Sequence, residues 1–365
     1  MSTPNISLPS TVSSTSRNSE DSGNSTATPR LVHALSAARH KRRRQYFALL
    51  IILTVTVIAL WLVSLMIGET FYSPSEVIAV IMGETVPGAS FTVGTLRLPR
   101  ATVAIFVGLA FGMAGTIFQT MLRNQLASPD IIGISASASA AGATGIIVFG
   151  LGQTSVSIVS TVVSLTVAVV IYLLSIKSGF TGTRMILIGI GCAALMQAWT
   201  SYVLSHAAAW DLPTATRWIT GSLNTMTWER GMPVIIVTLL IAPLLVACSH
   251  FLSVLGLGDD LARGLGLRLT LTRVVLFVGA VTLIAIATAA TGPIAFVAFM
   301  AGPIASRIFK PGTSLILPAG LLGALLVLVA DIAGQYLFGT RYPVGVITGA
   351  IGAPFLIYLL TRSSR

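Results

Sequence analysis

Long apolar runs recur along this chain, and they limit its possible folds more than any other feature. The first extends from Phe47 to Ile67 without a charged residue, and a helix that spans a membrane needs about 20 mainly apolar residues. Nine further windows follow, at residues 101–121, 131–151, 155–175, 183–207, 231–249, 271–291, 292–308, 314–334 and 343–361. We therefore predict an all-α membrane protein with about ten transmembrane helices in a compact bundle.

The composition agrees with lipid as the main solvent. Hydrophobic residues make up 54% of the 365 and charged residues 9%, whereas a soluble domain carries about 25% charged residues. The net charge of +11 is spread between apolar runs rather than gathered on one soluble face. This spread favours loop charges that orient a membrane protein over a nucleic-acid partner.

The sequence offers little chemistry of its own. No Gly-Lys dipeptide occurs, so the phosphate-binding loop of an ATPase is absent. Cys192 and Cys248 lie far apart, and the four histidines show no ligand spacing, so we predict no metal site. Asp331 is the one acid that could bind a coupling ion, but a lone acid near a helix end more often serves packing or capping. We expect no catalytic residue and no cofactor bound by this chain.

The N-terminal part differs in character from the rest. Residues 1–45 begin with a Ser/Thr-rich stretch and end in the basic cluster Arg39–Arg44. We predict a disordered cytoplasmic tail there, because the stretch cannot bury enough apolar surface to order itself. We favour this tail over two alternatives, namely a transit peptide for the Ser/Thr-rich stretch and a nucleic-acid-binding arm for the basic cluster. Residues 46–365 are predicted to form the transmembrane domain.

Basic residues indicate the orientation of the spans. With the N-terminus inside and ten spans, fifteen Lys or Arg residues fall on the inner side and five on the outer side, which is the usual inward bias. The outer five are Arg97, Arg100, Arg217, Arg230 and Arg341. We predict a multi-pass membrane protein with both termini in the cytoplasm. The inner and outer totals depend on whether the windows 271–291 and 292–308 are two spans or one, since only Thr291–Pro293 separates them.

Two local patterns refine this picture. Ser73, Pro74 and Glu76 form a capping-box pattern that predicts a short helix through about Met82. Gly108, Gly112 and similar small residues inside the apolar runs predict close helix–helix approach.

The segment LGLGDDLARGLGL (Leu255–Leu267) is charged and rich in glycine between two apolar runs. Asp259 and Asp260 favour a helix start, and Gly264 and Gly266 favour its end. Leu257, Leu261 and Leu265 recur every four residues and form an apolar stripe. The orientation places this short helix in the cytoplasm, where its apolar face needs a partner surface. The alternative is that it folds back onto its own helix ends.

Five stretches resemble the permease subunits of ABC importers for iron chelates and cobalamin. They are TLRLPRATVAIFVGLAFGMAGTIFQTMLRNQLASPDIIGIS at 95–135, WITGSL at 218–223, GLGDDLARGLG at 256–266, TGPIAFVAFMAGPIASRI at 291–308 and YPVGVITGAIGAPFLIYLL at 342–360. The resemblance covers about Tyr46–Arg365. It implies the type II importer permease fold, with ten helices in each subunit.

The same resemblance implies several partners. Two permeases, identical or sister subunits, pair around a central pathway, cytoplasmic ABC ATPases use the ATP, and an extracytoplasmic substrate-binding protein delivers the cargo. The implied ATPase-coupling residues are Leu257, Gly258, Asp259, Asp260, Leu261, Arg263 and Gly264. The implied docking residues for the binding protein are Arg97 and Arg100, with Arg341 in place of a family arginine that this chain lacks.

The pathway is also expected from particular residues. The resemblance places Thr181 and Thr183 at the cytoplasmic gate, and we expect Gln119, Gln197, Thr200 and Ser201 to line a broad pocket of small and polar side chains. The chain departs from the family pattern at Gln125 and Pro303, neither of which we expect to touch the pathway.

The favoured function is thus the permease of an ABC importer that carries a ferric siderophore by ATP-driven alternating access. The same architecture could carry cobalamin or haem. An ion-coupled secondary transporter would need a carboxylate in the middle of the bilayer, and the predicted spans contain none. A purely structural membrane subunit would not need the cytoplasmic amphipathic helix.

Overall fold

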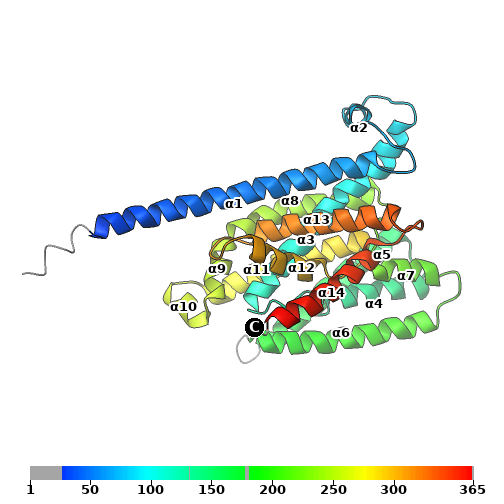
Figure 1. Cartoon of the computed structure of the whole chain (residues 1–365). Helices are drawn as coiled ribbons and strands as arrows, with labels where there is room; N and C mark the ends of the chain where they lie inside the picture. The colour runs from blue at the N-terminus through cyan, green and yellow to red at the C-terminus, as the bar shows by residue number, and fades with distance from the viewer. Residues whose placement is uncertain (1–26, 131, 177–180, 364–365) are drawn as a thin grey trace, which may run out of the picture. The chain divides into compact units, whose positions relative to one another are not determined.

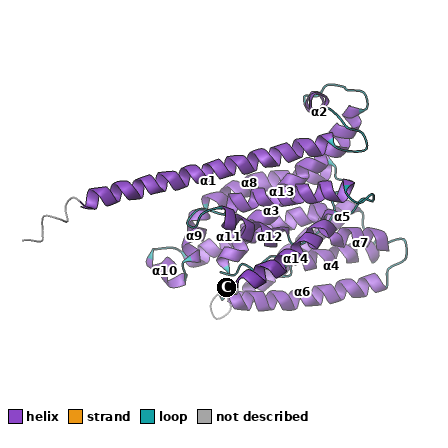
Figure 2. Ribbon diagram, in the orientation of Figure 1, coloured by secondary structure: helices purple, strands orange, loops and turns teal. Residues whose placement is uncertain are grey.

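The computed structural model describes residues 27–130, 132–176 and 181–363, and their secondary structure is helical throughout, as predicted (Figures 1 and 2). The helices are α1 (Ala27–Met66), α2 (Pro74–Ile81), the π-helix η1 (Ser90–Arg97), α3 (Leu98–Met121), α4 (Ile134–Ile147), α5 (Gln153–Ile176), α6 (Gly182–Ser205), α7 (Leu212–Thr220), α8 (Trp228–Ala247), α9 (Ser249–Gly256), α10 (Asp259–Gly264), α11 (Leu269–Thr291), α12 (Val297–Ile308), α13 (Ile316–Tyr336) and α14 (Val344–Ser363).

Eight helices of the described residues are long and apolar enough to cross a membrane. The other two predicted spans, 131–151 and 292–308, are the shorter apolar helices α4 and α12. At 1.5 Å per residue, the 14 residues of α4 extend about 21 Å, less than the roughly 30 Å of a hydrocarbon core. Both helices begin late because the residue before each, Gly133 or Phe296, has a left-handed backbone. Apolarity alone therefore overestimated the length of these two helices.

The chain divides into two units, residues 1–48 and 49–365. Residues 1–26 of the predicted tail lie outside the described residues. Helix α1 begins at Ala27, upstream of the domain boundary predicted at residue 46, and includes the basic cluster Arg39–Arg44. The Ala, Leu and Arg residues that precede Tyr46 favour a helix, and Arg43 stacks on the Phe47 ring at 5.7 Å one turn later. The predicted boundary at residue 46 stays a prediction.

Helix α3 is the centre of the second unit. It packs against α11, α12 and α13 (Figure 1), and most of its residues from Ala101 to Met121 are buried. A Cβ atom at Gly108 or Gly112 would collide with the backbone of residues 319–324 on α13. The small residues therefore allow the two helices to touch at their backbones, which confirms the packing role predicted for them.

The capping box at the start of α2 is also confirmed. The Glu76 carboxylate accepts a hydrogen bond of 2.7 Å from the backbone N–H of Ser73, and the Ser73 hydroxyl accepts one from the backbone N–H of Glu76. The bond from the Ser73 N–H, together with one of 2.8 Å that the Ser73 hydroxyl donates to the same carboxylate oxygen, lowers the pKa of Glu76. The helix ends at Ile81, one residue before the predicted end.

Helices α6 and α14 leave much of their surface uncovered within this chain. Helix α6 packs on α4 and α5 through one face that includes Met185, Gly189 and Ala193. Its other faces carry exposed side chains, among them Leu187 and Leu195. Helix α14 contacts α12 and α13 and exposes Ile351 and Ile357. Lipid or another subunit must cover these faces in a membrane.

Candidate functional site

The segment Leu255–Leu267 forms the end of α9, the short helix α10 and the turn into α11, and α10 stands at one end of the bundle (Figure 1). The helix begins at Asp259 and ends at Gly264, within the predicted limits. Gly258 and Gly266 have positive φ angles of 117° and 82°, which explains why glycines flank it.

Asp259 fixes α10 to the bundle. Its Oδ1 accepts a hydrogen bond of 2.7 Å from Nη2 of Arg273 on α11, and a second one from Arg123 at the end of α3. Burial opposes ionisation of this carboxyl, but the hydrogen bond from Arg273 and the charges of Arg273, Arg123 and Arg263 prevail and lower its pKa. Asp259 is therefore an anchor inside this chain.

The remaining coupling residues face outward. Leu257, Leu261 and Leu265 are 60%, 61% and 68% exposed, so the predicted apolar stripe exists and nothing within the described residues covers it. Asp260 is fully exposed and lies 3.4 Å from Arg263. The alternative of a helix folded back on its own bundle holds only for the opposite side, where Ala262 is buried.

At the other end of the bundle, the Arg97 side chain is hydrogen-bonded within the chain. Its guanidinium donates hydrogen bonds to the carbonyls of Leu65, Met66 and Thr70 at 2.9–3.1 Å and lies 5.2 Å from the centre of the Tyr72 ring. These carbonyls belong to the end of α1 and the chain that follows. Arg97 therefore caps the C-terminus of α1.

Arg100 forms a two-pronged ion pair with Asp331. Nη2 lies 2.6 Å from Oδ1, and Nε lies 2.9 Å from Oδ2. Asp331 is 3% exposed, and the pair joins the first turn of α3 to the last part of α13. The packing role expected for Asp331 fits this geometry.

Arg341 is the exposed member of the three predicted docking arginines. Its Nη2 lies 2.6 Å from Oε1 of Glu69, and both side chains are mostly exposed. A cavity of about 270 Å³ opens beside them. It is lined in part by Ser64, Arg97, Arg100, Asp331, Gln335 and Arg341. Docking by Arg97, Arg100 and Arg341 stays a prediction, and only Arg341 presents a mostly exposed charge.

One predicted pathway residue lies in a cavity between elements. Gln197 on α6 lines a space of about 350 Å³ together with Asp130, Phe296, Phe299 and Leu356. The Ser135 hydroxyl donates a hydrogen bond of 2.5 Å to Oδ1 of Asp130. The other carboxylate oxygen of Asp130, Oδ2, is shielded from solvent.

Sequence reasoning did not select Asp130. It lies four positions before the first residue of α4, a helix of 14 residues that is shorter than a hydrocarbon core is thick. The available signal was an acid immediately before the predicted span 131–151, close to the small-residue run at 133–145. The prediction that the spans contain no carboxylate in the middle of the bilayer is not tested by this residue, because Asp130 lies just before the predicted span 131–151.

The remaining pathway residues are dispersed. Gln119 is buried and donates a hydrogen bond of 3.0 Å to the Phe299 carbonyl, and it lines a separate cavity of about 290 Å³. Gln125 and Pro303 line that same cavity, so these two departures from the family pattern do lie beside an expected pathway residue. Residues 177–180 before the predicted gate lie outside the described residues.

Besides Gln197, four predicted pathway residues lie on α6 or directly before it, and they differ in exposure. Thr181 and Thr183 are exposed at the start of α6, as is Ser201 near its end. Thr200 is buried, and its hydroxyl donates to the Met196 carbonyl one turn earlier. The structure therefore does not bring these residues into one pocket with Gln119 and Gln197.

Within the described residues, no cluster of three or more His, Cys, Asp or Glu side chains could hold a metal ion. Both cysteines are free thiols.

Comparison with known proteins extends these findings. Residues 55–362 match the family model described as the FecCD transport family. The ferric enterobactin transport system permease protein FepG of Escherichia coli (strain K12) is 36% identical over 328 residues, which cover 89% of this chain and 98% of that protein. The achromobactin transport system permease protein CbrC of Dickeya dadantii (strain 3937) is 37% identical over 323 residues, 87% of this chain and 91% of the relative.

A solved structure is similar as well. The chain matches an inward-facing metal-chelate type ABC transporter with a TM-score of 0.76 and 25% identity, over 86% of this chain and 99% of the other.

Proposed function

The chain belongs to the FecCD transport family as a permease of the iron-chelate ABC importers, and we propose that it carries a ferric siderophore by ATP-driven alternating access. The ferric enterobactin and achromobactin permeases are similar over most of their length, which supports an iron chelate of this class over cobalamin or haem. The chain spans the bacterial inner membrane several times, and we propose that both termini are cytoplasmic.

The observation that carries the proposal is the leucine stripe of α10. Three leucines point away from a helix that is fixed by its charged and small residues. An exposed apolar stripe beside surface charges suits a protein partner. We propose that an ABC ATPase subunit docks there, and that Asp260 and Arg263 form the charged rim of the contact.

Energy would reach the pathway through this contact. The sequence has no phosphate-binding loop, so the partner binds and hydrolyses ATP and this chain binds no cofactor. Asp259 joins α10 to α3 and α11, and α3 is the buried centre of the bundle. A displacement of α10 would therefore be passed directly to the central helices.

The opposite end would receive the substrate-binding protein. We propose Arg341 and its neighbour Glu69 as direct contacts, because both charges are exposed. Arg97 and Arg100 would support this surface from within, since their guanidinium groups hold α1, α3 and α13 together.

A second permease, identical or a sister subunit, would complete the pathway. The uncovered faces of α6 and α14 are the surfaces proposed for this pairing, and the cavity with Gln197 and Asp130 lies between these helices and the start of α12. Apart from the Asp130 carboxylate, the wall is formed by small, apolar and amide side chains, which suits a bulky chelate better than a bare ion.

The test is uptake of radiolabelled ferric siderophore in a strain that lacks the gene. The wild-type chain should restore uptake, and an inactivated partner ATPase should abolish it while an uncoupler of the proton gradient leaves it intact over minutes. Excess cobalamin or haem should not compete. Uptake that persists with the inactive ATPase and stops with the uncoupler would indicate an ion-coupled transporter instead.

A further inference from the structure

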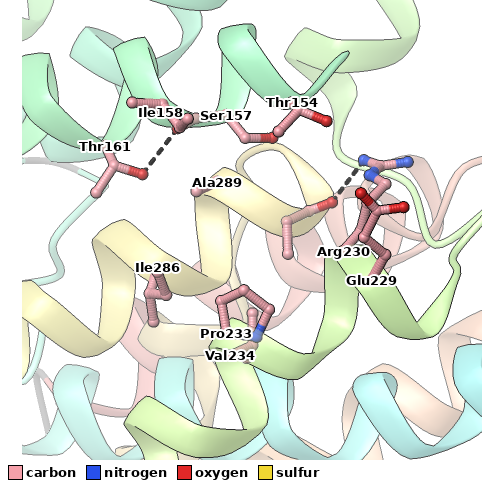
Figure 3. A pocket seen from close by; sticks show the side chains of 11 residues that line it. Thr154, Ser157, Ile158, Thr161, Glu229, Arg230, Pro233, Val234, Ile286 and Ala289 are labelled. Carbon is pink, nitrogen blue, oxygen red and sulfur yellow. Dashed lines mark hydrogen bonds between the residues drawn. The ribbon is translucent and has the colours of Figure 1, made fainter.

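A groove lies between α5, α8 and α11, apart from the cavities described above. Its volume is about 260 Å³. Figure 3 shows its lining side chains from the three helices. They are Thr154, Ser157, Ile158, Thr161, Glu229, Arg230, Pro233, Val234, Ile286, Ala289 and Ala290.

The groove begins where three membrane-spanning helices end together. Thr154 lies in the first turn of α5, Arg230 in the first turn of α8 and Ala290 in the last turn of α11. These helices have 24, 20 and 23 residues, so they extend about 30–36 Å and match the hydrocarbon core. This end of the groove therefore lies at the level of the lipid headgroups.

Two opposite charges stand at that end. Nη2 of Arg230 donates a hydrogen bond of 2.8 Å to the Ala290 carbonyl, as Figure 3 shows. Its Nε is buried and has no hydrogen-bond partner among the residues that the structure describes. Glu229 is exposed beside it. Within the described residues neither side chain has an ion-pair partner, so the groove offers one cation and one anion to a ligand.

The rest of the groove is apolar. Ile158, Val234 and Ile286 line it below the charges. The hydroxyls of Ser157 and Thr161 donate to carbonyls one turn earlier on α5, at 3.0 and 2.8 Å, so they need no polar ligand. Thr154 and Thr161 are seven residues apart, which gives the groove a length of about 10 Å along the helix axis.

We propose that this groove binds a phospholipid with a phosphoethanolamine headgroup. The phosphate would accept hydrogen bonds from the Arg230 guanidinium, the ammonium would pair with Glu229, and an acyl chain would lie along Ile158, Val234 and Ile286. A free phosphate would leave the apolar wall empty. An anionic lipid without an amine would place Glu229 beside a negative charge without compensation.

The test is native mass spectrometry of the full chain purified in a mild detergent. It is titrated with phosphatidylethanolamine, phosphatidylglycerol or phosphatidylcholine of identical acyl chains, and with inorganic phosphate as competitor. The wild type should retain phosphatidylethanolamine best, and phosphate should not displace it. Arg230→Gln should weaken this binding about tenfold, the effect of one lost charge-assisted hydrogen bond.

Two further variants make the outcome specific. Glu229→Gln should abolish the preference for phosphatidylethanolamine over phosphatidylglycerol, and it removes no hydrogen bond on which the fold depends. Arg217→Gln, an exposed arginine on α7 outside the groove, should change neither binding nor preference. Equal retention of all three lipids, displacement by phosphate, or an equal loss in Arg217→Gln would overturn the proposal.

Discussion

Nη2 of Arg273 lies 2.7 Å from Oδ1 of Asp259, and this bond fixes the short helix α10 to α11. Arg123 at the end of α3 binds the same oxygen. The neighbouring Asp260 is fully exposed. These two adjacent acids therefore differ in role: Asp259 binds arginines within the chain, whereas Asp260 presents its charge on the surface.

Asp259→Asn and Asp260→Asn should distinguish the internal role of Asp259 from the surface role of Asp260. The first removes the charge that holds two arginines, and we expect retention of the partner ATPase to fall about tenfold. The second removes an exposed charge worth about 0.2–1 kcal/mol, and the loss should be at most about fivefold. Co-purification of the ATPase with each variant measures the difference. Equal losses would contradict the anchoring role of Asp259.

The anchor should not respond to pH in the physiological range. Its arginine partners lower the pKa of Asp259 in the folded state. Its stabilisation is therefore complete above the ordinary value of about 3.9 and is lost only as the pH falls through the lower folded value. Tryptic cleavage after the exposed Arg263 reports loosening of α10. The ratio of cleavage rates between Asp259→Asn and the wild type should stay constant from pH 8 to pH 6, and a ratio that falls toward one at pH 6 would show that the carboxyl titrates there.

Leu261→Ser tests the leucine stripe. The side chain is 61% exposed, so we expect the free energy of unfolding of the permease to change by less than about 0.5 kcal/mol. Affinity for the ATPase should fall tenfold or more if the stripe is the core of an interface. Leu337→Ser is the matched control, since that leucine is 71% exposed just after α13. Similar affinity of both variants for the ATPase would exclude α10 as the docking site.

The ion pair between Arg100 and Asp331 should carry stability. Removal of one partner leaves a buried charge, which costs about 3–5 kcal/mol, so Arg100→Ala should lower the melting temperature of the purified protein. Arg100→Met combined with Asp331→Leu should recover part of this loss. Arg341→Ala should cost less than about 1 kcal/mol, since its pair with Glu69 is exposed. If Arg341→Ala nevertheless weakens association with the binding protein, the docking role belongs to Arg341.

Local features of this protein could be predicted well from its sequence. The capping box of α2 and the limits of α10 depend on residues within one or two turns, namely Ser73, Glu76, Asp259 and Gly264. The glycines of α3 could be assigned to helix contacts, although their partner helix α13 could not.

Features that depend on distant residues could not be predicted. Arg100 and Asp331 are 231 positions apart, and nothing in RLPR indicates that its arginines turn inward. The short helices α4 and α12 begin where Gly133 and Phe296 adopt positive φ angles, which an apolar count does not register. Asp130 was missed because it lies just outside the predicted span 131–151, and only the structure shows that it lines a cavity with residues of α6, α12 and α14.

The cavity beside α6 allows a test of the transport path. Gln197 lines this cavity, whereas Leu239 on α8 is 59% exposed and lines none of the cavities described above. Gln197→Trp should reduce uptake of the iron chelate tenfold or more, because the indole occupies part of the 350 Å³ space. Leu239→Trp adds an apolar side chain to an exposed apolar position away from α6 and α14 and should leave uptake within about twofold. Both variants should bind the ATPase normally, so that a loss can be assigned to the path and not to assembly. If Gln197→Trp leaves uptake unchanged, or if Leu239→Trp reduces it equally, the cargo does not pass through this cavity.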